Sequence, residues 1–407
     1  MSGNSTVASH LPRGFQAAGV AAGIKKTGAP DLALIVSERD CVAAATFTTN
    51  VVQAAPVVRG KSQLASPRAT IRAVVINSGC ANACTGTAGL ADAEETARLV
   101  AEALVRQHPS DNAWRITAEQ VFTMSTGVIG VPLPMDKLRA GIPAAAQQLS
   151  PQGLNEVARA IMTTDTRPKI ASIDRGAWRI AGIAKGAGMI HPNMATLLSC
   201  ILTDAAVEPA LLREFLHQAV AVSFNRIVID GDTSTNDTVL LLANGAGGIA
   251  IETPGQRNTF QQALNDVCVN LAQQVVRDGE GVTKFITLRI TGAHDEHMAD
   301  QVGRSIARSP LVKTAFYGED ANWGRVIAAA GYSGAAVDPN KMTLWFGPVK
   351  TFEAGEPTDY DEADASAAMK SDEIEVRLDL GLGEAETVLW TCDLSHEYVT
   401  INGKYRT

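Results

Sequence analysis

An α/β fold is predicted for this chain, with mixed β-sheets layered against helices and a β-rich C-terminal part. Apolar runs of strand length alternate with segments of helical periodicity along most of the sequence. After residue 340 the patterns are mainly those of strands. At 407 residues, the chain is long enough for two packed units or for one large α/β domain.

Strands are predicted where apolar and β-branched residues form short runs between turn residues. The first two, 31–37 and 41–46, flank the charged triplet 38–40 and are expected to form a β-hairpin. The run after Thr196 reads Leu-Leu-Ser-Cys-Ile-Leu, which predicts a fully buried strand. Further strands are predicted at 72–76, 121–124, 178–184, 226–229, 239–243, 285–290, 341–346, 374–380 and 386–391.

Helices are predicted where apolar residues recur with the 3.6-residue period, at 92–107, 154–162, 208–222, 256–278 and 296–308. In the first of these, Glu94 lies near the start and Arg106 near the end, as the helix dipole favours. Pro209 suits the first turn of its helix. The acidic stretch 353–372 is expected to be a solvated surface segment.

The composition is that of an ordinary globular protein, with 46% hydrophobic and 19% charged residues. A net charge of −8 argues against a nucleic-acid partner. The six cysteines show no paired zinc-ligand spacing and do not require an oxidising compartment. No apolar signal core and no run of 18 apolar residues is present, so a cytoplasmic enzyme without a membrane span is expected.

The stretch from Lys185 to Ala205 joins a glycine-rich loop to a buried strand, and the junction is Ala195–Thr196. A threonine hydroxyl placed there can attack the preceding carbonyl, shift the acyl group to oxygen and let water split the ester. The freed α-amine of Thr196, with a pKa near ~8, can then act as general base for its own hydroxyl. A threonine that begins a strand is also explained by β-propensity alone.

Two further segments place small polar residues directly after a strand, where functional loops often lie. One is Asn77–Gly86, and a tight turn rich in backbone caps explains it equally well. The other contains Thr126-Gly127, whose hydroxyl and backbone N–H groups are the donors that an oxyanion hole requires. A simple turn is the alternative there too. A third segment, Gly245–Ala250, fits a relaxed nucleotide-binding pattern, but no helix is predicted to begin directly after it.

Several long motifs of the chain, taken together, match one known family. They are Phe47-Thr48-Thr49-Asn50, 77–86, Thr126-Gly127, 162–166, 185–196, 231–238, 279–285, 322–325 and 393–407. Through them the chain resembles the bifunctional ornithine acetyltransferase/N-acetylglutamate synthase family of arginine biosynthesis. It departs from that pattern at Cys80, where asparagine is expected in many relatives.

The resemblance implies self-processing at Ala195–Thr196 into two chains of one intertwined α/β fold. Residues 1–195 would form an alpha chain that carries the oxyanion hole and part of the substrate site, and residues 196–407 a beta chain that begins with the nucleophile. The roles that the resemblance implies are Thr196 as nucleophile, Thr126 and Gly127 as oxyanion hole, and Thr163, Lys185, Thr196, Glu280, Asn402 and Thr407 as substrate-binding residues. Thr164 is the alternative to Thr163, because alignment of the motif decides between the two neighbours.

The implied reaction is acetyl transfer from N-acetylornithine to glutamate through an acetyl-Thr196 intermediate, without a cofactor or a metal. Acetyl-CoA is a further possible donor, and an α₂β₂ or larger assembly is expected. By our inference, Lys185 offers a cation for a carboxylate and Glu280 an anion for an ammonium group. The alternative is an N-terminal-nucleophile amidohydrolase or aminopeptidase, in which water rather than glutamate resolves the acyl-enzyme.

Overall fold

The computed structural model describes residues 10–66, 69–111, 114–191 and 197–404. The chain divides into two compact units that are each discontinuous in sequence. Unit 1 comprises Met1–Gly186, Pro192–Asn225 and Thr233–Val275, and unit 2 comprises Ala187–His191, Arg226–Asp232 and Val276–Thr407. The α/β class predicted from the sequence is confirmed. Within the described ranges, no helix combines the length and the apolar character needed to cross a membrane.

Unit 1 is built on an eight-stranded mixed sheet with the order β4-β3-β2-β8-β7-β6-β5, and β1 pairs with β2. Its strands are β1 (Phe15–Val20), β2 (Leu32–Phe47), β3 (Thr70–Cys80), β4 (Val121–Val128), β5 (Lys169–Asp174), β6 (Arg179–Lys185), β7 (Leu198–Thr203) and β8 (Thr238–Ala243). The helices are α1 (Ala55–Gln63), α2 (Gly86–Gln107), α3 (Met135–Gln147), α4 (Leu154–Ala160), α5 (Pro209–Val222) and α6 (Pro254–Arg277).

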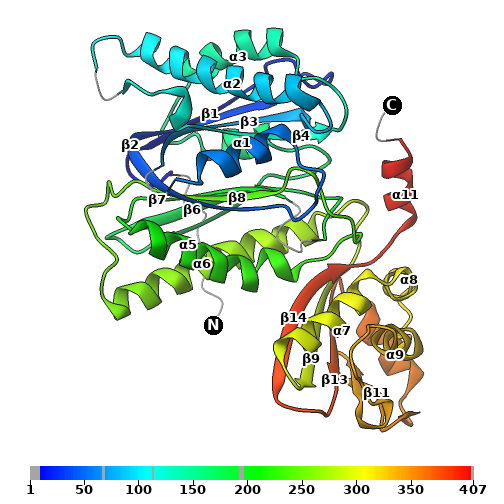
Figure 1. Cartoon of the computed structure of the whole chain (residues 1–407). Coiled ribbons are helices and arrows are strands. Elements are labelled where there is room, and N and C mark those ends of the chain that lie inside the picture. The colour runs from blue at the N-terminus through cyan, green and yellow to red at the C-terminus, as the bar shows by residue number, and fades with distance from the viewer. Residues whose placement is uncertain (1–9, 67–68, 112–113, 192–196, 405–407) are drawn as a thin grey trace. The chain divides into compact units, whose positions relative to one another are not determined.

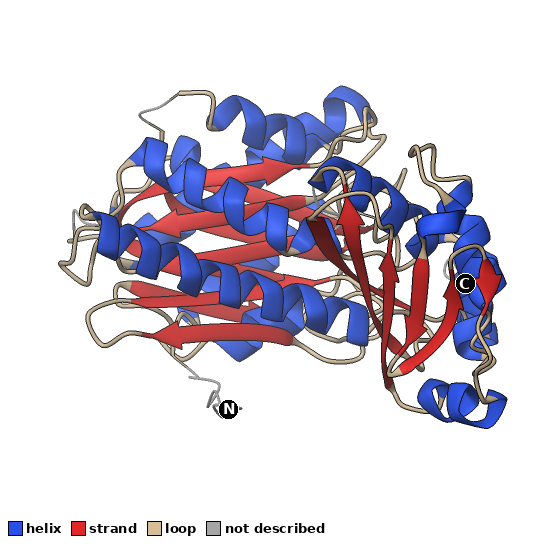
Figure 2. Cartoon of the chain, turned by 90° about the horizontal axis from the view of Figure 1, so that it is seen from below, coloured by secondary structure: helices blue, strands red, loops and turns tan. Residues whose placement is uncertain are grey.

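The sheet of unit 1 folds over on itself, so that two β-layers lie between two helical layers (Figure 1). One buried cluster joins apolar side chains of β1–β4, such as Ile35 and Ile76, to those of β5–β8, such as Ile183 and Leu240. The outer face of the first layer is covered by α2 and α3. Figure 2 views the unit from below, where helices lie across the strands of the second layer. Both layers are therefore sealed by apolar burial on both faces.

The predicted hairpin 31–46 is wrong, because these residues form the single strand β2. Its first half pairs with β1 and β3, and its second half, from Val42 to Phe47, pairs with β8. The charged residues 38–40 are exposed and lie between these two halves, where the pairing to β3 shifts register. Thus a charged triplet that looks like a turn instead marks the place where one strand passes between layers.

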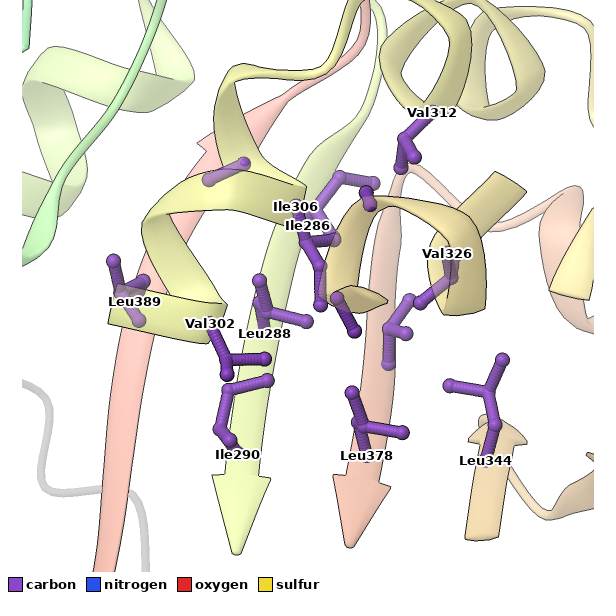
Figure 3. Packing of buried hydrophobic residues seen from close by; sticks show 14 of the residues in the cluster. Ile286, Leu288, Ile290, Val302, Ile306, Val312, Val326, Leu344, Leu378 and Leu389 are labelled. Carbon is purple, nitrogen blue, oxygen red and sulfur yellow. The ribbon is translucent and has the colours of Figure 1, made fainter. Parts of the chain in front are cut away.

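Unit 2 contains a six-stranded sheet with the order β12-β11-β10-β13-β9-β14. The strands are β9 (Phe285–Ala293), β10 (Thr343–Phe346), β11 (Val349–Glu353), β12 (Glu356–Pro357), β13 (Glu373–Asp379) and β14 (Ala385–Cys392). The helices are α7 (Glu296–Arg308), α8 (Pro310–Tyr317), α9 (Trp323–Gly331), α10 (Glu362–Met369) and α11 (His396–Gly403). Figure 3 shows the core, in which Val302 and Ile306 of α7 pack on Leu288 and Ile290 of β9.

Two predictions for this unit need correction. The stretch 353–372 is not only solvated surface, since α10 begins after the capping carboxylate of Asp361 and buries Ala365 and Met369. The predicted strand 226–229 is reduced to a single bridge between Ile227 and Trp390. The acidity of 353–372 masked the buried residues of α10, and the apolar residues 227–229 are buried without forming a strand. In both places burial depends on contacts distant in sequence, which local patterns do not show.

Candidate active site

The Thr126-Gly127 motif, predicted to form an oxyanion hole, lies at the end of a strand in unit 1. β4 runs on past its predicted end and includes Thr126 and Gly127, and the Thr126 side chain is largely buried. Lys185, the last residue of β6, donates a hydrogen bond from Nζ to Thr126 Oγ1 at 3.2 Å. The Lys185 ammonium group can only donate hydrogen bonds, so the Thr126 hydroxyl oxygen must be the acceptor in this contact. The hydroxyl proton of Thr126 can therefore be donated to another group. Two residues that the sequence predicts for the site are thereby brought together.

Gly127 has a conformation and a contact that only glycine permits. Its φ is +132°, and a Cβ on it would lie 2.3 Å from the carbonyl carbon of Gly79 and 2.5 Å from the backbone nitrogen of Cys80. Gly79 also has positive φ and pairs with Gly127 across the parallel β3–β4 ladder. The close approach of the two strands explains why the motif requires glycine at this point.

A buried polar network lies behind this corner. Ser125 Oγ donates to Asn77 Oδ1 at 2.6 Å, and Asn77 Nδ2 donates to the Cys80 carbonyl at 2.8 Å. Asn236 Nδ2 donates to the carbonyl groups of Ala81 (2.6 Å) and Ser125 (2.8 Å). Satisfied buried networks of this kind fix backbone geometry. Asn77, near the end of β3, and Asn236, just before β8, therefore hold the end of β4 in place.

Asp165 lies in the family motif 162–166 and has no role predicted from the sequence. Its buried carboxylate accepts from Thr163 N at 2.9 Å, from Gly186 N at 2.7 Å and from Lys169 Nζ at 2.5 Å. Burial alone would raise the pKa of Asp165, but the Lys185 and Lys169 charges and these hydrogen bonds hold it below its usual value. One carboxylate thus fixes the backbone at Thr163 and next to Lys185.

Asp237 is a second acidic residue that the sequence reasoning missed. It directly precedes β8 and is almost completely buried. Burial raises the pKa of Asp237 well above its ordinary value, against the opposing effects of Ser234, Lys185 and Thr48. Its Oδ2 has no hydrogen-bond partner within the described ranges. Asp237 therefore holds its proton to higher pH than an ordinary carboxyl group does, in contrast to Asp165.

In unit 2, Glu280 and Asn402 are brought together. Asn402 Nδ2 donates to Glu280 Oε2 at 2.7 Å and to the Tyr398 carbonyl at 3.0 Å. Because the amide nitrogen of Asn402 donates both of these hydrogen bonds, its Oδ1 is left as an acceptor beside the Glu280 carboxylate. A Cβ on Gly188 would lie 2.3 to 2.8 Å from the Glu280 carboxyl atoms, so glycine at 188 leaves room for this side chain. Such a pair of acceptors suits an ammonium ligand.

Asp230, also missed from the sequence, organises the neighbouring part of unit 2. Its carboxylate accepts from Met189 N at 2.6 Å, Ile190 N at 2.9 Å and the Tyr398 hydroxyl at 3.2 Å. Burial, followed by the charge of Asp230, raises the pKa of Tyr398, which keeps the phenol protonated. The segment that carries Gly188 is thus tied to the helix that carries Asn402.

Comparison with known proteins decides the family, because the ArgJ family model matches residues 16–407. The chain belongs to the ArgJ family. It is 50% identical over 406 residues to the arginine biosynthesis bifunctional protein ArgJ of Symbiobacterium thermophilum, covering 97% of this chain and 98% of that one. The protein of the same name from Geobacter sulfurreducens is 46% identical over 402 residues, covering 97% and 99%.

Solved structures of the family match parts of the chain. Ornithine acetyltransferase complexed with ornithine, from Mycobacterium tuberculosis, is 46% identical and covers 46% of this chain and 97% of that chain, with a TM-score of 0.43. The bifunctional protein argJ from Bacillus halodurans is 41% identical and covers 49% and 95%, with a TM-score of 0.48.

The family resemblance predicted from the motifs is confirmed, and this ArgJ-family chain is an acyltransferase of arginine biosynthesis. Fungal relatives, such as that of Paracoccidioides brasiliensis, are named as mitochondrial, whereas the two bacterial relatives are not. The cytoplasmic location expected from the sequence stays a prediction. The segment 245–250 forms a turn after β8, and α6 begins only at Pro254, so this turn lacks the adjoining helix that a dinucleotide site uses.

Three residues predicted for the site, Ala195, Thr196 and Thr407, lie outside the described residues. The strand predicted after Thr196 is confirmed as β7, whose residues are all buried. Directly before it, the carbonyl of Leu197 accepts from Thr238 N at 3.0 Å. The roles assigned to Thr163, Lys185, Glu280 and Asn402 in substrate binding stay predictions.

Proposed function

We propose that this ArgJ-family enzyme transfers an acetyl group from N-acetylornithine to glutamate through an acetyl-Thr196 intermediate. The observation that supports this most strongly is the contact of Lys185 with Thr126 beside Gly127. It leaves the Thr126 proton available to a developing oxyanion at a buried strand end. The names of the relatives, which place them in arginine biosynthesis, agree with this choice of substrates.

In the proposed first half-reaction, the Thr196 hydroxyl attacks the acetyl carbonyl of N-acetylornithine. The α-amine of Thr196 takes the hydroxyl proton, and the tetrahedral oxyanion is stabilised by Thr126 and Gly127. The C–N bond then breaks, the amine of ornithine takes the proton and leaves, and an acetyl ester remains on Thr196. In the second half-reaction the amine of glutamate attacks this ester, which gives N-acetylglutamate and restores the hydroxyl.

We propose that Lys185 binds a carboxylate common to both amino-acid substrates, with Thr163 beside it. Glu280 and Asn402 present acceptor atoms, which suits an ammonium group. Thr407 completes the proposed set of binding residues. Acetyl-CoA as a further donor is compatible with the same acyl-enzyme.

The nucleophile is proposed to arise by self-cleavage between Ala195 and Thr196. The strand arrangement supports a product whose pieces stay together, because β7 and β8 of the second piece lie within the sheet between β2 and β6 of the first. β8 pairs with β2 and β7 pairs with β6, so separation would expose a sheet buried on both faces. An assembly of two or more copies of each piece is part of the proposal.

The test is acetyl transfer by purified protein, with products measured with and without glutamate. The proposal predicts N-acetylglutamate and ornithine in equal amounts, with little acetate formed while glutamate is present. Release of acetate at the same rate in both conditions would instead assign the protein to the amidohydrolase class, in which water resolves the acyl-enzyme.

A further inference from the structure

Two lysines and one aspartate are placed together at the end of β6. Asp165 lies 2.5 Å from Lys169 Nζ, and both side chains are fully inaccessible to solvent. Asp165 Oδ1 also accepts from the backbone N–H of Gly186, the residue after Lys185. Lys185 acts on the same carboxylate electrostatically and extends its ammonium group to Thr126. Lys185, which the proposed function assigns to substrate binding, therefore shares the neighbouring carboxylate of Asp165 with the buried Lys169.

The charges of this cluster can be counted. Lys169 and Lys185 each contribute +1, and the ionised Asp165 contributes −1, which leaves one net positive charge. Asp237 also acts on Lys185, and burial raises the pKa of this carboxyl group well above its usual value, so Asp237 loses its proton less readily than Asp165 does. Lys25 lies outside these three counted groups, although it also interacts with Asp165 and Lys185; Asp31 acts on it as well, and its Nζ donates to the Pro30 carbonyl at 2.7 Å. Asp165 is therefore the acid on which both Lys169 and Lys185 act.

We propose that Lys169 is a positioning residue that neutralises Asp165, so that the charge of Lys185 remains available to the carboxylate of the substrate. This inference rests on the proposed function. Lys169 is fully buried, so it does not touch the substrate, and it acts through Asp165. If Lys169 were absent, Asp165 and Lys185 would form a closed ion pair whose net charge is zero, and a carboxylate ligand would lose most of its attraction.

A purely structural role for Lys169 is the competing explanation, because breaking a buried ion pair is costly in any protein. The two explanations differ for a donor that lacks the negative charge, because removal of both partners relieves an unpaired buried charge in either case. A structural role predicts that Lys169→Met impairs the carboxylate donor and its uncharged carboxamide alike, whereas the charge role predicts a loss confined to the carboxylate. The charge role also predicts recovery in Asp165→Asn/Lys169→Met, because this double variant restores the net charge of +1 that the wild-type cluster has.

The first experiment measures KM and kcat for N-acetylornithine and for its carboxamide, which lacks the negative charge. For Lys169→Met we expect KM for the carboxylate donor to rise about tenfold, with a smaller change in kcat. KM for the carboxamide should stay near its wild-type value. In the double variant, KM for the carboxylate should return toward wild type. A double variant no better than Lys169→Met, or an equal rise in KM for both donors, would overturn the inference.

The second experiment needs no turnover. The pKa of Lys185 is measured by ¹³C NMR titration of the lysine ε-carbons, with its signal assigned by its loss in Lys185→Met. We expect the pKa of Lys185 to be higher in Lys169→Met than in wild type and lower again in the double variant. An unchanged pKa overturns this inference even if acetyl transfer is observed. A changed pKa in a protein that transfers no acetyl group would support the charge coupling while the proposed function fails.

Discussion

Lys185 and Thr126 meet at 3.2 Å although their strands, β6 and β4, lie far apart in the order of the sheet. The contact forms because the sheet folds over at β2, which brings the two β-layers of unit 1 face to face. Each layer supplies one half of the polar corner. The fold therefore creates the candidate active site by closing one sheet on itself, with a cation on one layer and a hydroxyl donor on the other.

The Thr126 hydroxyl is predicted to contribute to catalysis as an oxyanion donor. Thr126→Val keeps the shape of the side chain but removes the hydroxyl, and we expect kcat for acetyl transfer to fall about 10²- to 10³-fold. Thr126→Ser is the matched control, since it keeps the hydroxyl and should retain most of the activity. The measurement is steady-state acetyl transfer from N-acetylornithine to glutamate. Equal kcat values for Thr126→Val and wild type would remove Thr126 from the oxyanion hole.

The tight strand contact at Gly127 is predicted to govern stability. In Gly127→Ala the new Cβ would meet the Gly79 backbone at 2.3 Å, and we expect a loss of about 3 kcal/mol or more in the free energy of unfolding. Gly130→Ala is the control, because Gly130 also has positive φ but open space around its Cβ, and should cost about 1–2 kcal/mol. Urea titration of the three proteins compares these costs. Similar losses in the free energy of unfolding for both variants would show that the close contact between β3 and β4 at Gly127 does not contribute to the cost.

Gly188 is predicted to affect ligand binding rather than stability. In Gly188→Ala the new methyl group would displace the carboxylate of Glu280 and disturb its bond to Asn402. Because Glu280 is a flexible side chain, stability should change little, but KM for N-acetylornithine should rise on the order of ten- to a hundredfold. Gly331→Ala, at an open position of unit 2, should change neither quantity. An unaltered KM for Gly188→Ala would argue against Glu280 as a substrate ligand.

Asp237 is predicted to make the protein less stable as pH rises. Its folded-state pKa is raised by burial, so the folded state holds a proton that the unfolded state releases above about pH 4. The free energy of unfolding should therefore fall between about pH 4 and the folded-state pKa. Asp237→Asn cannot ionise and should show a weaker fall over that range in urea titrations. A variant with the wild-type pH dependence would mean that Asp237 is ionised in the folded protein.

Some features of this protein are visible in its sequence, and others arise only from the packing of distant segments. Motif order singled out Thr126, Gly127 and Lys185, whose roles stay predictions, and the structure brings Lys185 and Thr126 into contact. Apolar periodicity predicted α7 with its observed bounds. The burial of charged residues could not be predicted in this way. Asp165 and Lys169 look like ordinary surface residues in the sequence, but both side chains are buried. Their burial depends on the packing of β5 against β6 and on backbone N–H groups from other segments, so periodicity gives no indication of it.

The charged triplet in β2 illustrates the opposite error. Polar residues between two apolar runs usually mark a turn, and here they mark the exposed bend of one strand. The correct interpretation requires knowing that β8, from much later in the chain, pairs with the second half of β2. Pairing partners of this kind are set by the whole fold and not by the local sequence.

Intact mass spectrometry of the purified protein tests the central claim most directly. A threonine nucleophile created by self-cleavage predicts two masses that correspond to residues 1–195 and 196–407, and a single full-length mass for Thr196→Ala together with loss of acetyl transfer. A wild-type protein that transfers acetyl groups while showing one full-length mass would contradict the account, as would a Thr196→Ala variant that still divides into two pieces.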